Sequence, residues 1–331
     1  DIKLGGGKAL TITDSSGKGT GVFGPVTADR GTLTLESGHL QGLKVFSGSE
    51  PTILLWGGKL TGISCPVPVF NLLPNGYALM DDSGLPVDPT ITIDDSKTYT
   101  VKDSTNRCIS SQKEGSAAIG SDTIPFTLSL ETADSEIGKM GFTWYIVKED
   151  GTTQKLAATT SDVTPGTNGV YTCNAANMTG DPNGWTDLEV NKTYNVLCVV
   201  SGKTSDGTSK WQTPMRGYKL QTLPPSLENA EIRFADGGQE RTFWPDPDNH
   251  SVGKIEILSG LGLYTVTLGG KTLVEGTDYQ VISGNVATGI GTYDLTIEGI
   301  APNYSGTKTA QWTVVPLPLG TFKINSIKKQ Y

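Results

Sequence analysis

The sequence feature that most constrains the fold is a short internal repeat near the N-terminus. The segment 33–43 (LTLESGHLQGL) aligns without gaps on the segment 53–63 (ILLWGGKLTGI), and apolar residues and glycines recur at the same positions. The copies start 20 residues apart, a spacing typical of stacked coils, because a single coil cannot bury its own inward residues. The strands of a hairpin domain need no such fixed register.

A third, looser copy lies upstream at 10–17 (LTITDSSG), where Leu10 and Ile12 would point inward as Leu33 and Leu35 do. Three copies are about the minimum for a stable stack. The repeat therefore predicts a short parallel β-solenoid, with a plain antiparallel β domain as the alternative. Glycines would serve the corners between its strands.

The next segment, 69–84 (VFNLLPNGYALMDDSG), is predicted to cap this stack. Four of its apolar residues would cover the open end of the apolar ladder: Leu72, Leu73, Tyr77 and Leu79. The segment resembles the "LL-x-x-GYA" closing motif of short β-helical domains in surface proteins of gut Firmicutes, and this resemblance implies a right-handed solenoid. Runs of period two at 90–93 and 99–101 predict a short strand pair before a domain boundary near residue 105.

Residues 106–222 predict a β-sandwich of immunoglobulin-like pattern, with strand-length runs at 126–130, 141–147, 169–173 and 193–200. Asp150-Gly151 predicts a tight hairpin turn, because this pair accepts the positive φ values of such turns. Trp144 lies in mid-strand like an immunoglobulin core tryptophan. Tyr194 only roughly matches a tyrosine corner, since it stands four residues before Cys198 and the usual spacing is two.

The four cysteines are Cys65, Cys108, Cys173 and Cys198, and none shows a CxxC metal spacing. Buried thiols and a single disulfide are both compatible with this pattern. The candidate disulfide joins Cys173 and Cys198. It would close a loop of about 25 residues and stabilise the fold by about 3 kcal/mol.

A proline-stiffened linker at 221–226 leads into a third predicted domain, residues 223–318. A terminal strand is predicted within 319–331. The motifs of the third domain are EGTDYQV, GTYDLTIEG, NYSG and WTVV, within residues 275–315. They resemble the immunoglobulin-like or MBG-like stalk repeats of Clostridiales surface proteins. That resemblance implies a multidomain bacterial protein that is exported and associated with the cell surface or cell wall. Trp312, like Trp144, is expected in a core.

Composition narrows the classes of partner. The net charge of −8 would repel a nucleic-acid backbone, so nucleic acid is not expected as a partner. No run of 18 apolar residues is present, so this segment is not expected to insert into a membrane. We expect a monomer that uses no cofactor.

The sequence favours a non-catalytic protein. The chain has only two histidines, His39 and His250, so most histidine-based general-base sites and zinc sites are not expected. β-Helical glycosidases align catalytic groups across many coils. The repeat here has about three coils, and its outward residues, Glu36, His39, Trp56 and Lys59, do not form such an extended row of catalytic groups. The carboxylate pairs 81–82 and 94–95 are interpreted as solvated turns, and 246–249 (DPDN) lacks the pattern of a calcium loop.

Tryptophans are the remaining candidates for binding, because glycan and protein partners both use flat aromatic anchors. The candidate binding residues are Trp56, Trp185, Trp211 and Trp244. Trp56 replaces Glu36 in the repeat, so it should point outward, although packing under the cap is an equal alternative. The sequence predicts adhesion or ligand binding to a host glycan or host protein. A purely structural stalk is the alternative, and a carbohydrate-active fragment is the third hypothesis.

Overall fold

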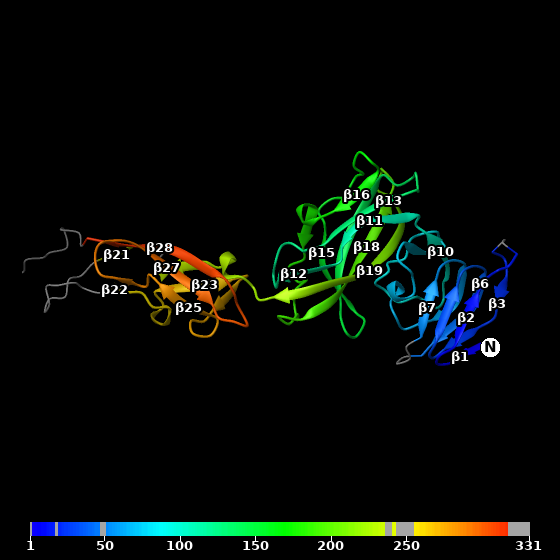
Figure 1. The fold of residues 1–331 in the computed structure, drawn as a ribbon, viewed down its shortest axis with the longest axis horizontal. Coiled ribbons are helices and arrows are strands. Elements are labelled where there is room, and N and C mark those ends of the chain that lie inside the picture. The colour runs from blue at the N-terminus through cyan, green and yellow to red at the C-terminus, as the bar shows by residue number, and fades with distance from the viewer. Residues whose placement is uncertain (1, 17–18, 47–50, 236–239, 243–254, 317–331) are drawn as a thin grey trace, which may run out of the picture. The chain divides into compact units, whose positions relative to one another are not determined.

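The computed structural model of the chain describes residues 2–16, 19–46, 51–235, 240–242 and 255–316 (Figure 1). These residues form β-strands and a few short 3₁₀ helices, with no α-helix among them, so the predicted all-β class is confirmed. None of the helices in these ranges has the length and apolar character that a membrane span needs. The chain divides into two compact units, residues 1–223 and 224–331, and each has its own hydrophobic core.

The first unit begins with two parallel sheets. Their strands are β1 (Ile2–Leu4), β2 (Ala9–Ile12), β3 (Val22–Phe23), β4 (Val26–Ala28), β5 (Thr32–Leu35), β6 (His39–Val45), β7 (Thr52–Leu55) and β8 (Lys59–Ser64). One sheet has the order β1–β4–β6–β8, with β3 also paired to β6, and the other has the order β2–β5–β7. All of these pairings are parallel, so the antiparallel alternative is wrong for this part of the chain.

The offset of the sequence repeat is the register between β5 and β7 in the smaller sheet and between β6 and β8 in the larger one. Leu33, Leu35, Leu40 and Leu43 pair with Ile53, Leu55, Leu60 and Ile63, respectively, and all eight side chains are buried. Upstream, Leu10 and Ile12 pair with Leu33 and Leu35. The inward side chains of neighbouring strands thus form continuous apolar rows, and burial of these rows explains why apolar residues recur at this spacing.

Two glycines of the repeat are required by close approach of the backbone. Gly38 and Gly58 have φ values of 89° and 84°, which side chains of L-residues rarely adopt. A Cβ atom at Gly58 would also lie 2.6 Å from the carbonyl oxygen of Gly38 in the preceding repeat. The glycine therefore recurs both because of its conformation and because the neighbouring turn leaves no room for a side chain.

The capping segment contains η1 (Val69–Asn71) and β9 (Tyr77–Asp81), and it is followed by β10 (Thr98–Asp103). β10 pairs antiparallel with β8 on one side and with β9 on the other, which extends the larger parallel sheet. Leu72, Leu73 and Leu79 are buried against the apolar rows, while Tyr77 is half-buried. The Leu72 carbonyl accepts a hydrogen bond from the Leu55 amide at 2.9 Å, which ties the cap to the last strand of the smaller sheet.

The predicted strand at 90–93 is wrong. This segment is a turn that makes only an isolated bridge, between Thr92 and Pro68. The Asp88 side chain accepts hydrogen bonds from the amide and hydroxyl of Thr90, both at 2.8 Å. Such local bonds satisfy backbone groups that a strand would pair, and they favour a turn despite the alternating side chains. The strand pair of this region is β9 with β10 instead.

The rest of the first unit is a β-sandwich. Its elements are β11 (Asn106–Gln112), β12 (Glu114–Ala118), β13 (Thr127–Thr132), β14 (Lys139–Val147), β15 (Thr153–Thr159), β16 (Val170–Cys173), η2 (Ala175–Asn177), β17 (Met178–Gly180), β18 (Thr193–Lys203) and β19 (Ser209–Leu223). One sheet has the order β11–β13–β16 and the other β12–β19–β18–β14–β15–β17. The four predicted runs fall on β13, β14, β16 and β18. The longest strand, β19, was missed because Pro214 and Gly217 are residues that usually interrupt a strand.

The predicted hairpin at Asp150-Gly151 joins β14 to β15, which pair antiparallel. Gly151 has a φ of 81°. The Lys148 amide donates to the Thr152 carbonyl at 2.9 Å, which closes the turn. The hairpin prediction is therefore confirmed, and its physical basis is the positive φ that glycine accepts.

The capping segment also packs on the sandwich. Phe70 is buried with Leu197 and Val199 of β18. The Arg216 guanidinium donates to the Leu73 carbonyl at 2.9 Å, and the Arg216 amide donates to Asn75 Oδ1 at 3.0 Å. Residues 1–105 and 106–222, which the sequence predicted as separate domains, therefore share apolar and polar contacts within one unit.

The second unit is built from short strands and two 3₁₀ helices with assigned bounds. These elements are η3 (Leu227–Asn229), β20 (Glu231–Phe234), β21 (Glu240–Thr242), β22 (Ile255–Glu256), η5 (Ser259–Leu261), β23 (Tyr264–Leu268), β24 (Lys271–Leu273), β25 (Tyr279–Ser283), β26 (Val286–Ala287), β27 (Gly291–Gly299) and β28 (Thr307–Val315). Its sheets are β20–β23–β24, β21–β28–β27–β25 and β22–β26. Trp312 is buried as predicted, and its indole N–H donates to the Gly284 carbonyl at 2.7 Å. The predicted terminal strand within 319–331 lies outside the described residues.

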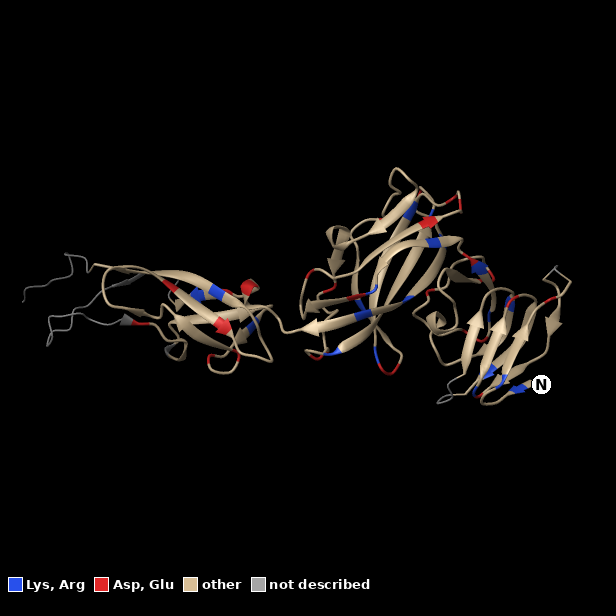
Figure 2. Ribbon diagram, viewed as in Figure 1, with Lys and Arg blue, Asp and Glu red and all other residues tan. Residues whose placement is uncertain are grey.

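Charged residues are spread over the strands and loops of both units (Figure 2). No described strand carries a continuous row of lysine and arginine in this view. The described ion pairs are mostly exposed, and such pairs contribute little to stability. Apolar burial therefore has the larger part in holding each fold together.

Candidate functional site

Trp56 is the one candidate tryptophan that the described structure places at the surface. It directly follows β7 and is 45% exposed, while its amide donates to the Leu35 carbonyl at 2.8 Å. Its ring and the Tyr77 ring are arranged edge to face, with centroids 5.2 Å apart and an interplanar angle of 77°. Trp56 thus points outward and also touches the cap. The predicted exposure and the alternative of packing against the cap each describe part of its environment.

Polar groups flank this tryptophan at the same end of the smaller parallel sheet. Because Leu35 pairs with Leu55, Glu36 and Trp56 occupy neighbouring positions just beyond their strands. Glu36 is exposed, and its carboxylate accepts a hydrogen bond from the Thr13 hydroxyl at 2.7 Å. A flat apolar ring beside hydrogen-bonding groups has the chemistry that recognises sugars and the aromatic or polar side chains of a protein.

The sequence interpretation missed Tyr77 as a member of this surface. Tyr77 was assigned to the cap alone, because its position within the capping motif suggested burial. It is instead half-buried and holds the Trp56 ring by an edge-to-face contact. Nothing in the linear spacing of the two aromatic residues indicates this contact, since the chain passes through η1 between them.

Trp185 is not a surface residue, and its assignment as an exposed anchor is wrong. Its side chain is 6% exposed and belongs to the sandwich core. The indole N–H donates to the Ser121 carbonyl at 3.1 Å. Burial of the apolar ring together with a satisfied N–H is the usual way a loop tryptophan anchors its loop, so its role here is structural.

Trp211 is also wrongly assigned as an exposed anchor. It lies in β19, is fully buried and packs on Gly202 of the neighbouring strand. A Cβ atom at Gly202 would lie 2.3 Å from the Trp211 ring, so the glycine makes space for the indole. Trp244, the fourth candidate, lies outside the described residues, as does the 246–249 segment considered for calcium.

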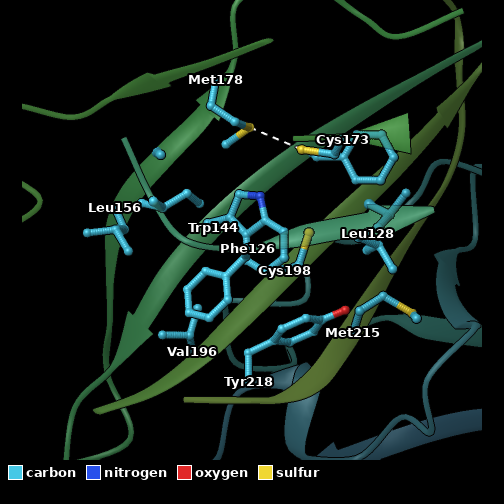
Figure 3. Packing of buried hydrophobic residues seen from close by; sticks show 14 of the residues in the cluster. Phe126, Leu128, Trp144, Leu156, Cys173, Met178, Val196, Cys198, Met215 and Tyr218 are labelled. Atoms are coloured by element: carbon cyan, nitrogen blue, oxygen red, sulfur yellow. Dashed lines mark hydrogen bonds between the residues drawn. The ribbon is translucent and has the colours of Figure 1, made fainter. Parts of the chain in front are cut away.

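The sandwich core is centred on Trp144, as predicted (Figure 3). Its ring stacks on Phe126, with centroids 5.1 Å apart, and meets Tyr218 edge-on at 4.9 Å. Cys173 and Cys198 enter this core from opposite sheets, on β16 and β18. Aromatic and sulfur-containing side chains pack well together, which suits this arrangement.

All four cysteines are free thiols, and the candidate disulfide between Cys173 and Cys198 is not formed in the structure. The Cys173 thiol donates to Met178 Sδ at 3.1 Å (Figure 3). Burial raises the pKa of Cys173 to about 11 and also raises the pKa of Cys198. Both side chains therefore behave as small apolar groups, whereas Cys108 is exposed.

The remaining polar candidates do not assemble into a catalytic or metal centre among the described residues. Asp81 and Asp94 accept hydrogen bonds from nearby backbone amides, as the turn interpretation predicted. His39 Nε2 hydrogen-bonds to the Thr61 hydroxyl on the neighbouring strand, and Lys59 is exposed. Within the part of the chain that the structure describes, no three metal-ligating side chains converge.

Two comparisons with known proteins give no match. No protein-family model matches the chain. A search of curated proteins finds no match either. A functional interpretation therefore depends on the geometry described above and on the motif resemblances in the sequence.

Proposed function

We propose that this chain is a non-catalytic extracellular module of a bacterial surface protein, and that it binds a host glycan or host protein through Trp56. The observation that carries the proposal is a large indole that is 45% exposed and oriented by the Tyr77 ring. A fixed aromatic surface loses little conformational entropy on binding, which makes it an effective anchor.

In this proposal the parallel sheets and cap form a short right-handed β-solenoid, and the two sandwich-like parts are immunoglobulin-like domains. Parallel pairing at the repeat offset supports the first assignment. The two-sheet packing around Trp144 supports the second. The stalk-repeat motifs within 275–315 support a location at the surface or wall of a Clostridiales-type bacterium. An extracellular setting also suits an adhesive role.

The test is a binding screen of the whole chain against host glycans, mucins, matrix proteins and immunoglobulins. We expect a saturable interaction that Trp56→Ala weakens by about 2 kcal/mol or more, the loss typical of a central aromatic anchor. The control is Leu85→Ala, which truncates another exposed apolar side chain of the same unit. Equal binding by both variants would reject Trp56 as the anchor.

The alternative proposal is a purely structural stalk. The observation that favours it is the burial of Trp185 and Trp211, which leaves fewer exposed aromatic anchors than the sequence suggested. A screen with no saturable partner would support the stalk. Release of reducing ends from a polysaccharide would support the third hypothesis, a carbohydrate-active fragment, against both.

A further inference from the structure

A small polar cavity lies in the first unit, between the capping segment and the sandwich. Its volume is about 150 Å³. The polar part of its wall consists of Asn75, Asn106, Cys108, Lys113, Arg216 and Tyr218. These residues come from the cap, from β11, from the single residue between β11 and β12, and from β19, so the cavity exists only in the folded unit.

A β-bulge in β19 builds one side of this cavity. Val196 of β18 pairs with Tyr218 and Cys198 pairs with Met215, so Arg216 and Gly217 together lie opposite the single residue Leu197, and β19 contains one extra residue. Gly217 has a φ of 92°. A bulge redirects side chains that would otherwise follow the sheet, and the hydrogen bonds of Arg216 to Leu73 and Asn75 then hold its guanidinium at the cavity wall.

The charge of the cavity wall is positive. It contains Lys113 and Arg216 and no carboxylate. Neither cation forms an ion pair with another described residue. Lys113 Nζ lies over the bulge, 3.8 Å from where a Cβ of Gly217 would stand. Burial lowers the pKa of Arg216, and no acidic neighbour opposes this effect.

Two residues of the cavity wall carry buried polar groups with unused hydrogen-bonding capacity. The Tyr218 hydroxyl is buried, with the residue 1% exposed, and it has no hydrogen-bond partner among the described residues. Burial raises the pKa of Tyr218, and an interaction with the nearby Ser111 side chain offsets only part of this effect. Both side-chain polar atoms of Asn106 are likewise buried without a partner. Buried polar groups normally have partners, so these groups indicate a ligand or solvent site.

We propose that this cavity binds a compact oxyanion, such as sulfate, phosphate or the carboxylate of an acidic sugar. Lys113 and Arg216 supply charge, and the Tyr218 hydroxyl and Asn106 Nδ2 supply neutral donors. The volume corresponds to the share of about five water molecules, which is room for one such group. Trp56 is not among the residues that line this cavity, and the inference does not depend on the function proposed above.

The experiment is calorimetric titration of the whole chain at constant ionic strength with sodium sulfate, sodium phosphate and sodium glucuronate, and with glucose as a neutral control. We expect saturable binding of at least one anion and none of glucose. Binding of the inorganic ions alone would identify a free anion as the ligand. Binding of glucuronate would identify an acidic sugar as the source of the bound oxyanion.

Variants separate a ligand site from a structural role. We expect Lys113→Met and Tyr218→Phe each to lower the affinity by about tenfold, the effect of losing one hydrogen bond to a charged group. Lys219→Met removes an equal charge from an exposed neighbour outside the cavity and should leave the affinity unchanged. Binding that survives Lys113→Met and Tyr218→Phe, or no binding of any anion, would overturn the proposal.

Discussion

Replacing Gly58 by alanine tests whether the repeats stack in solution as the structure describes. The substitution has two unfavourable effects. A φ of 84° places an L-residue in the left-handed region, at about 1–2 kcal/mol. The new Cβ would also lie 2.6 Å from the Gly38 carbonyl oxygen, and forcing backbone apart in a packed region costs about 1–3 kcal/mol. We therefore expect Gly58→Ala to destabilise the first unit by about 3 kcal/mol.

Gly84→Ala is the matched control. Gly84 has a φ of 74°, but no atom lies within 4 Å of the position of its missing Cβ. This substitution has only the unfavourable effect of the positive φ, so we expect it to lower the free energy of unfolding by about 1–2 kcal/mol. The difference between the two variants therefore measures the contact between successive repeats.

Scanning calorimetry of the whole chain measures both variants. For a unit of this size, about 1 kcal/mol corresponds to a change in Tm of about 2–4 °C. Gly58→Ala should lower the Tm of the first unit by about 6–12 °C, while Gly84→Ala should lower it by about 2–8 °C. The transition of the second unit should not move in either variant. Equal shifts in the two variants would refute the close approach of Gly38 and Gly58.

Trp185→Ala should destabilise the first unit by about 3–5 kcal/mol in urea unfolding, because it empties a buried site, and a change below about 1 kcal/mol would contradict its burial. A thiol reagent should modify the folded chain once, at Cys108, as measured by intact mass, because Cys65, Cys173 and Cys198 are buried and burial raises the pKa of each. Modification at any of these three buried thiols would contradict the prediction. Hydrogen bonds from Ser16 and from backbone amides lower the pKa of Asp14 from 3.8 to about 2. The folded-state pKa lies below the unfolded one, so the stabilisation is present above about pH 4 and is lost as the pH falls to 2. The Tm difference between the wild type and Asp14→Asn should vanish over this interval, and a difference that persists below pH 2 would refute the assignment.

Several features could be predicted from the sequence because they depend on local patterns. The repeat at 33–43 and 53–63 places apolar residues at the positions that share a parallel register, and no long-range information is needed to align them. The Asp150-Gly151 hairpin and the core positions of Trp144 and Trp312 follow from turn chemistry and strand alternation. The segment 90–93 shows the limit of such patterns, because the alternation there is outweighed by Asx-turn hydrogen bonds that the Asp88 carboxylate accepts from Thr90.

Exposure of the tryptophans could not be predicted in the same way. Trp185 and Trp211 are candidate anchors in the sequence because glycan and protein partners both use aromatic side chains, but residues distant in sequence bury them. Ser121 satisfies the indole N–H of Trp185, and Gly202 provides the space for Trp211. Conversely, Trp56 remains exposed and contacts Tyr77.

The sequence by itself determined the all-β class, the stacking register of the repeats and the main core aromatic residues, because periodicity and turn residues specify strands locally. Only the tertiary structure decided which aromatic side chains reach solvent and how the cap joins the sandwich. It also brought Lys113, Arg216 and Tyr218 to one cavity. These outcomes depend on a β-bulge and on contacts between residues far apart in the chain, and a linear pattern does not record such contacts.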